Sequence, residues 1–339
     1  MIFFFRRHWF LLIVFLIFLA LVSAIAGSYF FDFSRTRMEW GVTFSSVYAQ
    51  TELGLDWQAA YLAILDDLQV DNIRLSAYWN QIEAVNGRYD FKDLDWQINE
   101  ASKRQVKIVL AVGRRLPRWP ECHDPEWLKD LKAIDAEEAQ LKFVQAVVNR
   151  YKDNQQIKYF QVENEPFLST FGICPPPNRL LLKEEVAQVK KLTAKPILVT
   201  DSGELSTWWS ISHVGGEILG TTLYRVVYNP QVGYFRWFTP PAFYWLRVQL
   251  IKILTPIQKV IVAELQAESW HKPNINLAQM SLADHNLSLS LNQLKENIAF
   301  TRRAGFDEAY LWGAEWWYYM KTGKNYPEYW NEAKKLWVK

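Results

Sequence analysis

Two glutamates follow apolar segments with the pattern of buried strands. Residues 157–162 run into the polar segment that contains Glu165, and residues 259–263 run into Glu264. A carboxylate at the end of an apolar strand is costly unless it is paired or hydrogen-bonded. Hydrolysis of a glycosidic bond uses two such carboxylates, one to protonate the leaving oxygen and the other to attack the anomeric carbon. The sequence therefore favours Glu165 and Glu264 as a catalytic pair.

The neighbours of these two residues have roles of their own or compete with them. Asn164 can donate a hydrogen bond to a substrate hydroxyl or hold the carboxylate beside it. Glu163 should point to the opposite side of the chain from Asn164, so we interpret it as structural. Glu268 lies four residues after Glu264, and it replaces Glu264 as the candidate if the strand extends further than the apolar run.

Composition narrows the classes of function. The chain has 38 Lys and Arg against 36 Asp and Glu, and half of its residues are hydrophobic. Such a balance disfavours both nucleic acid as a partner and a mostly disordered chain. The five His are scattered, and HExxH, CxxC and phosphate-binding glycine motifs are missing. We therefore expect no metal and no cofactor.

Aromatic residues make up 16% of the chain, and 17 residues are Trp. This number exceeds what a core needs, and flat ring faces are surfaces on which pyranose sugars stack. An aromatic-rich core is the alternative interpretation.

The first 36 residues have the pattern of a membrane-targeting segment. Arg6 and Arg7 precede the apolar run 9–26, which is just long enough to span a bilayer, whereas Ala24-x-Ala26 resembles a signal-peptidase site. Either a cleaved signal peptide or a retained anchor (1–36) would place residues 37–339 outside the cytoplasm. Cys122 and Cys174 can form a disulfide in an oxidising compartment or remain free thiols.

After this segment, short apolar runs alternate with amphipathic stretches. Eight strands alternating with helices over about 300 residues favour one α/β domain, a (β/α)8 TIM barrel, whose catalytic residues should lie at the C-terminal ends of the strands. The strand patterns occupy residues 40–44, 72–77, 106–112, 157–162, 196–200, 220–224, 259–263 and 308–312. The helical patterns occupy residues 56–69, 90–104, 135–152, 179–192, 240–254 and 287–298.

The motifs together resemble the retaining glycoside hydrolases of clan A. Asn164-Glu165-Pro166 after the fourth strand and Glu264 ending the seventh resemble the clan's catalytic motifs. The resemblance covers residues 40–317 and is nearest to the cellulase-like family 5, with parts shared with families 39 and 42. The other stretches that carry it are Ile73-Arg74-Leu75, the segment from Trp79 to Asp95, and Leu311-Trp312-Gly313.

The resemblance implies a mechanism and a set of site residues. Glu165 would be the general acid/base with a raised pKa, and Glu264 the nucleophile, ionised beside Arg74. Cleavage of a β-linked glycan would proceed by double displacement with retention. The substrate-binding set comprises Arg74, Asn164 (at the 2-hydroxyl), Trp79, Trp312 and Tyr228, with Tyr224 as the alternative to Tyr228 for the contact with the nucleophile.

Several interpretations stay open at this stage. Arg74 can be a surface ion-pair partner, and Trp79, Trp119 and Trp312 can be packing residues. A non-catalytic carbohydrate-binding barrel and a transglycosylase share the same residues, and a membrane-tethered protein scaffold is a further class. We expect a monomer with a carbohydrate substrate. The glycan, its linkage and endo or exo action are not determined by the sequence.

Overall fold

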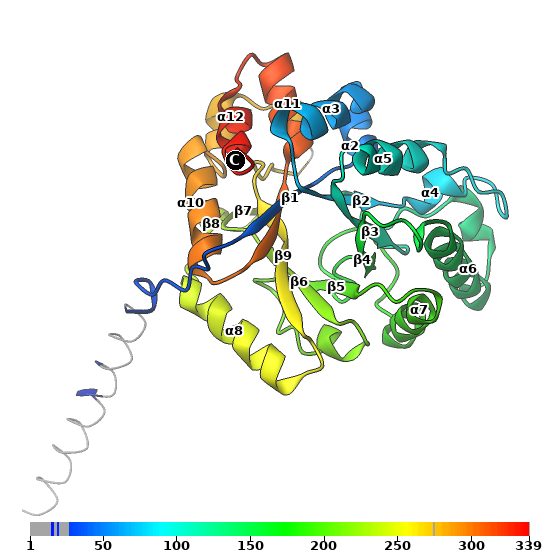
Figure 1. Cartoon of the computed structure of the whole chain (residues 1–339). Coiled ribbons are helices and arrows are strands. Elements are labelled where there is room, and N and C mark those ends of the chain that lie inside the picture. Colours follow the sequence, from blue (N-terminus) through cyan, green and yellow to red (C-terminus); the bar gives the residue numbers. More distant parts are fainter. Residues whose placement is uncertain (1–14, 17–18, 20–26, 274, 339) are drawn as a thin grey trace, which may run out of the picture.

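Eight parallel strands close into a barrel in the computed structural model, which describes residues 15–16, 19, 27–273 and 275–338 (Figure 1). Each strand pairs with the next along the chain, and the last pairs with the first, which confirms the predicted (β/α)8 barrel. The barrel strands are β1 (Glu39–Thr43), β2 (Asn72–Ser76), β3 (Lys107–Val112), β4 (Ile157–Val162), β5 (Ile197–Asp201), β6 (Ile218–Leu223), β9 (Lys259–Gln266) and β10 (Glu308–Trp312).

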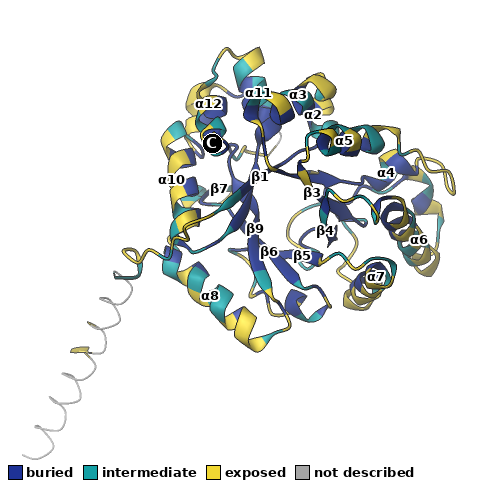
Figure 2. Cartoon of the chain, in the orientation of Figure 1, coloured by how far each residue is buried: buried dark blue, intermediate teal, exposed yellow. Residues whose placement is uncertain are grey.

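Helices surround the barrel and turn their apolar faces toward it. Figure 2 shows buried strands in the centre and exposed residues on the outer sides of the helices. This arrangement follows from the sequence, because strands covered on both faces are nearly continuous apolar runs while the covering helices are amphipathic. The helices are α2 (Ser46–Thr51), α3 (Trp57–Ala63), α4 (Trp79–Ile82), α5 (Lys92–Lys103), α6 (Ala133–Tyr151), α7 (Arg179–Leu192), α8 (Pro241–Leu254), α9 (Leu282–Asn286), α10 (Leu291–Arg303), α11 (Ala314–Gly323) and α12 (Glu328–Lys334).

Short helical turns complete the connections between these elements. A π-helical turn continues α3, and the other turns are 3₁₀ helices. Between β5 and β6 the described chain has only one such turn in place of a full helix. The turns are η1 (Ile64–Leu68), η2 (Glu126–Asp130), η3 (Ile211–His213) and η4 (Leu277–Gln279).

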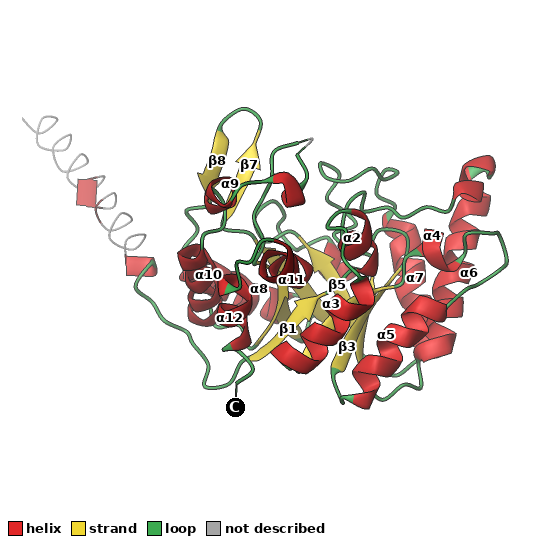
Figure 3. Cartoon of the chain, turned by 90° about the horizontal axis from the view of Figure 1, so that it is seen from above, coloured by secondary structure: helices red, strands yellow, loops and turns green. Residues whose placement is uncertain are grey.

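Two features differ from the predicted elements. After β6 the chain forms an antiparallel hairpin, β7 (Val226–Asn229) and β8 (Gly233–Arg236), which projects beyond the barrel next to α9 (Figure 3). Strand β9 extends three residues beyond the predicted end at residue 263, to Gln266. Glu264 therefore lies inside the last part of the strand, and its side chain belongs to the wall of the barrel mouth.

The predicted segment 1–36 lies largely outside the described residues. Within the described part of the chain, none of the helices has the length and apolar character needed to cross a bilayer. The division into residues 1–36 and 37–339 stays a prediction.

Candidate active site

Glu264 is held by a cation and a phenol. Its Oε1 lies 3.0 Å from Arg74 Nη1, and its Oε2 accepts a hydrogen bond of 3.0 Å from the Tyr224 hydroxyl. Glu264 is 3% exposed and Arg74 is completely buried. A carboxylate removed from water needs such charged and hydrogen-bonded partners to stay ionised. The two oxygens of Glu264 thus each have a hydrogen-bond donor at the end of β9, one cationic and one phenolic.

Arg74 joins three strands of the barrel through its guanidinium group. From β2, its Nε donates to Gln161 Oε1 at 2.8 Å, and its Nη2 donates to Asn164 Oδ1 at 2.7 Å. It also binds Glu264 on β9. The Arg74 side chain thus holds Gln161 of β4, Asn164 after β4 and Glu264 of β9. Arg74 is therefore an internal residue of the barrel mouth and not a surface ion-pair partner.

Glu165 occupies the turn directly after β4 in a very different environment. Its φ angle is +44°, and its backbone N–H donates to Thr200 Oγ1 at 2.9 Å. Its Oε1 is buried without a hydrogen-bond partner among the described residues. Burial first, and then the negative charge of Glu264, raise the pKa of Glu165 well above its usual value. The surroundings of Glu165 thus favour its protonated form and leave one oxygen without a partner among the described residues.

Glu163 points to the other side of the chain and has a structural role. Its carboxylate accepts hydrogen bonds from the backbone N–H groups of Arg114 and Arg115, at 2.6 and 2.7 Å, and from Gln140 Nε2 at 3.1 Å. A Cβ atom at Gly113, where φ is +127°, would lie 2.2 Å from Glu163 Oε1. The glycine is thus required for the loop after β3 to close onto this carboxylate.

Asn164 brings a further carboxylate to the site. Its Oδ1 accepts from Arg74, from Gln161 at 3.2 Å and from Thr200 at 3.2 Å. Its Nδ2 donates to Glu121 Oε2 at 3.3 Å. Glu121 comes from the loop after β3 and is not among the site residues expected from the sequence. No strand or helix pattern marks that loop, and its neighbour Cys122 is the one signal that it is tethered.

The loops after β3 and β4 are joined covalently. Cys122 and Cys174 form a disulfide, which is one of the two alternatives left open by the sequence. The backbone N–H of Ile173 also donates to the carbonyl of Pro120 at 2.9 Å. Both loops lie at the C-terminal ends of the strands, so the bridge stabilises the side of the barrel that carries Glu165 and Glu121.

Comparisons with known proteins agree with this fold. No family model matches the chain. Over 195 residues it is 26% identical to the β-galactosidase BgaA of Clostridium cellulovorans, a stretch that covers 49% of this chain and 28% of that protein. The chain thus spans less than a third of its curated relative.

Solved structures share the barrel over most of the chain. Xylanase 10B of Thermotoga petrophila RKU-1 superposes with a TM-score of 0.55 at 12% identity, covering 82% of each chain. The exo-β-1,4-mannosidase Op5Man5 from Opitutaceae bacterium strain TAV5 gives a TM-score of 0.55 at 16% identity, covering 84% of this chain and 53% of its own. The chain shares its fold with glycoside hydrolases. This shared barrel is the fold that the resemblance in the sequence implied.

Glu268, the alternative to Glu264, has other partners in this glycoside hydrolase fold. It forms an ion pair with Arg118, and its Oε1 accepts from Trp312 Nε1 at 2.8 Å. Arg118 also pairs with Glu315 at 3.1 Å. The described contacts of Glu268 include neither Arg74 nor Tyr224, so the ion pair that would hold a nucleophile belongs to Glu264.

Trp312 lies at the barrel mouth but is largely covered. The guanidinium carbon of Arg118 is 4.2 Å from the centre of the Trp312 ring. The same carbon is 3.7 Å from the centre of the ring of Tyr48, which belongs to α2. The loop after β3 therefore reaches across the mouth to the end of β10. A sugar that stacks on this face of Trp312 would have to displace Arg118.

Two predicted substrate contacts are placed elsewhere. Trp79 is fully buried, stacks on Phe143 of α6 and donates from Nε1 to Glu83, because the first turn of α4 faces the helix layer and not the barrel mouth. Tyr228 lies on the hairpin and packs against Tyr234. Strand β6 ends at Leu223, so Tyr224 is the tyrosine that contacts Glu264.

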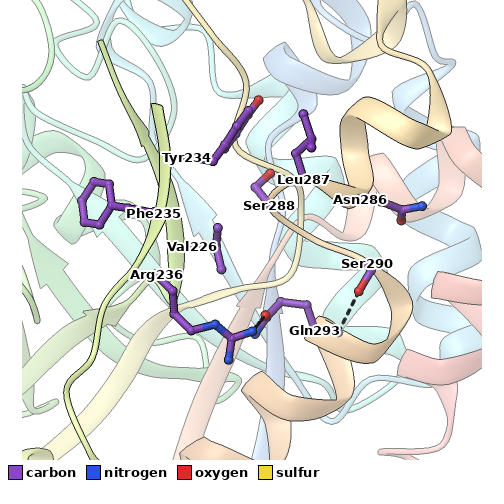
Figure 4. Close-up of a pocket in the computed structure, with 9 residues that line it drawn as sticks. All are labelled: Val226, Tyr234, Phe235, Arg236, Asn286, Leu287, Ser288, Ser290 and Gln293. Atoms are coloured by element: carbon purple, nitrogen blue, oxygen red, sulfur yellow. Dashed lines mark hydrogen bonds between the residues drawn. The ribbon is translucent and has the colours of Figure 1, made fainter. Parts of the chain in front are cut away.

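A cavity of about 370 Å³ lies beside the hairpin, between it and the segment that leads into α10 (Figure 4). Residues 226, 234–236, 286–288, 290 and 293 line it, and none of the carboxylates described above does. Among the described residues, no group of three His, Cys, Asp or Glu side chains is arranged to hold a metal ion.

Proposed function

We propose that the chain is a retaining glycoside hydrolase that cleaves a β-linked glycan with two glutamates. The observation that carries this proposal is the contrast between two buried carboxyl groups at one end of the barrel. Glu264 is paired with Arg74 and Tyr224, whereas Glu165 has an unpartnered oxygen and a raised pKa. Retaining glycosidases need such a contrast between an ionised nucleophile and a protonated acid.

In the first step, Glu264 attacks the anomeric carbon while the glycosidic C–O bond breaks. Glu165 gives its proton to the leaving oxygen, so the aglycone departs as an alcohol and the sugar becomes an ester of Glu264. In the second step, Glu165, now ionised, takes a proton from water, and the water oxygen attacks the same carbon. The ester bond breaks, and both carboxyl groups return to their starting states.

The same proposal places the enzyme outside the cytoplasm, attached to the membrane or released from it. Arg6 and Arg7 before the apolar run 9–26 support this location, as does the Cys122–Cys174 disulfide, because such bonds persist in oxidising compartments. Cell fractionation with protease treatment of intact cells tests it. An enzyme that stays protected in intact cells would contradict this part of the proposal.

The activity is tested with aryl β-glycosides, chosen as glucoside, galactoside, xyloside and mannoside because the similar proteins act on several of these. Glu264→Gln should lower kcat by several decades, and Glu165→Ala should do the same for substrates with poor leaving groups. A mechanism-based 2-fluoro glycoside should add one sugar mass to Glu264. Glu268→Gln, a buried carboxylate at the same rim, is the matched control and should keep most of the activity.

The outcomes separate the alternatives. Loss of activity in Glu268→Gln but not in Glu264→Gln would identify Glu268, four residues later, as the nucleophile. Binding of an oligosaccharide without turnover would support the non-catalytic barrel. Longer products in the presence of acceptor sugars would identify a transglycosylase, which uses the same residues.

A further inference from the structure

Glu121 is held in place by the backbone around it. Its φ angle is +72°, its carbonyl accepts from Leu116 N–H at 2.8 Å, and its own N–H donates to the Arg118 carbonyl at 2.8 Å. A Cβ atom at Gly172 would lie 2.8 Å from Glu121 Cβ. A left-handed backbone at a non-glycine residue costs about 1–3 kcal/mol, and such residues concentrate at functional sites. The loop therefore holds this carboxylate at the barrel mouth at some expense of stability.

Asn164 leaves only one kind of group for a ligand. Its Oδ1 already accepts from Arg74, Gln161 and Thr200. Only Nδ2 can therefore bind a substrate oxygen, as a donor. The Nδ2 group points at Glu121 Oε2 across 3.3 Å, a long hydrogen bond. A hydroxyl that binds Asn164 thus has an acceptor, the Glu121 carboxyl group, within reach.

The position of Asn164 identifies the hydroxyl. One guanidinium group, that of Arg74, holds both Glu264 Oε1 at 3.0 Å and Asn164 Oδ1 at 2.7 Å. In the proposed mechanism, on which this inference rests, Glu264 attacks the anomeric carbon. The hydroxyl nearest to that carbon is the one on C2, so Asn164 lies beside the 2-hydroxyl of the reacting sugar.

We propose that Glu121 contacts the substrate and holds its 2-hydroxyl together with Asn164. The Nδ2 of Asn164 donates to the hydroxyl oxygen, and the hydroxyl donates its proton to Glu121 Oε2. The substrates are then glycosides with a free 2-hydroxyl. A 2-acetamido sugar is excluded, because its bulky group cannot enter the buried gap between the two side chains, and its N–H cannot accept from Asn164.

The surroundings of Glu121 agree with this role. Burial, followed by the charge of Glu264, raises the pKa of Glu121 to about 8, so that it adds little negative charge beside the nucleophile at neutral pH. Its carbonyl oxygen still accepts a hydrogen bond in that state. The nearest cation, Arg115 Nε, lies 4.0 Å away, and Arg115 also donates to the carbonyl of Phe171.

The test compares an aryl β-glycoside with its 2-deoxy counterpart, using Glu121→Ala and Glu121→Gln. Glu121→Ala should lower kcat/KM for the parent glycoside by about 3- to 10-fold, the range for a lost hydrogen bond between uncharged groups. The kcat/KM for the 2-deoxy glycoside should change by less than about twofold. Glu121→Gln keeps an acceptor oxygen and should lose less than Glu121→Ala. Glu268→Gln is the control, and it should change kcat/KM for both substrates by the same factor.

If Glu121 has a purely structural role, Glu121→Ala should lower kcat/KM for the two substrates by the same factor. That result would overturn the inference while leaving the proposed function intact. Turnover of 2-acetamido glycosides at rates similar to the parent would also overturn it. If the unsubstituted protein turns over none of the parent glycosides, the proposed function is wrong, and this inference is wrong with it. Glu121→Gln is the second variant that keeps the test decisive if Glu121→Ala does not fold.

The pH profile gives an independent readout. The kcat/KM should fall at alkaline pH as Glu165 loses the proton that the leaving group needs. Above about pH 8 Glu121 is ionised, and its charge then contributes to the raised pKa of Glu165, so Glu121→Gln should move this alkaline limb to lower pH. The charge of Glu268 is offset by its ion pair with Arg118, so Glu268→Gln should leave the limb in place. A limb that stays fixed in Glu121→Gln would count against the contact.

Discussion

Glu264 and Glu165 have the same side chain, and their partners make them chemically different. Arg74 and Tyr224 both donate hydrogen bonds to the oxygens of Glu264, and such bonds favour the ionised form of a carboxyl group. The contacts of Glu165 with described residues include no charged donor, and burial, followed by the nearby charge of Glu264, raises its pKa. In the proposed mechanism, the different roles of these two glutamates therefore follow from their positions, at the scale of single hydrogen bonds.

Tyr224→Phe tests this argument at the nucleophile. Removing the hydroxyl takes away a 3.0 Å hydrogen bond to Glu264 Oε2 and leaves that oxygen buried. Since hydrogen bonds to charged groups contribute about 1.5–3 kcal/mol, kcat should fall by about 10- to 100-fold. Tyr228→Phe, the matched control on the hairpin, should change kcat by less than about twofold. Steady-state kinetics decide, and equal losses in both variants would refute the assignment.

At the scale of elements, the loops after β3 and β4 are built as one unit. Glu163 accepts hydrogen bonds from two backbone N–H groups of the loop after β3. The Cys122–Cys174 disulfide joins this loop to the loop after β4. Glu165 and Glu121, which these loops carry, are thus positioned by contacts behind the site. The helix layer has a different task, which Trp79 illustrates.

Trp79→Ala should destabilise the protein and leave substrate binding unchanged. The side chain is fully buried against Phe143, so its removal should lower the free energy of unfolding by about 3–5 kcal/mol. Trp119→Ala is the control, because Trp119 is 62% exposed and its loss should change that free energy by about 0.5 kcal/mol or less. Urea denaturation measures both. A raised KM in Trp79→Ala without loss of stability would restore the sugar-contact interpretation.

The sequence predicted the elements better than the site. Apolar runs located all eight barrel strands, because strands buried on both faces lack polar alternation. The end of β9 was placed too early, since Glu264 and Gln266 are polar residues with partners inside the barrel: Gln266 accepts from the N–H groups of Arg225 and Val226. Glu121 was missed because its position depends on the long-range contacts of an irregular loop.

At the scale of the whole molecule, several carboxyl groups are buried with little compensation. Burial raises the pKa of Glu121 to about 8 and that of Glu204 to about 7. It also raises the pKa of Glu163 and Glu185, which share a contact with Gln140. In the unfolded chain a glutamate ionises near pH 4.3. The folded protein therefore retains protons that the unfolded chain has already lost.

This difference predicts a stability that falls as the pH rises from about 5 to 8. A state that binds more protons is favoured at low pH, and the folded state binds more in this range. Glu308, whose pKa is lowered between Lys158 and Lys259, acts below this window. His123 and His285, whose pKa burial lowers to about 4, bind fewer protons in the folded state below about pH 6.5, so they offset part of the decline there. For Glu204 alone, a pKa of about 7 in the folded protein corresponds to a decline of roughly 3 kcal/mol between pH 5 and 7.

Urea denaturation at several pH values should thus give a free energy of unfolding that is several kcal/mol larger at pH 5 than at pH 8. In Glu204→Gln the residue has no proton to lose, and the decline should be flatter by up to that amount. The amide can still accept from Tyr244 Oη, which donates to Glu204 Oε1 at 2.8 Å, so the variant should fold. Glu137→Gln, at a partly exposed position of α6, should show the decline of the parent. A stability that increases between pH 5 and 8 would mean that these carboxyl groups are ionised in the folded protein, and the protonated state of Glu165 would then need another source.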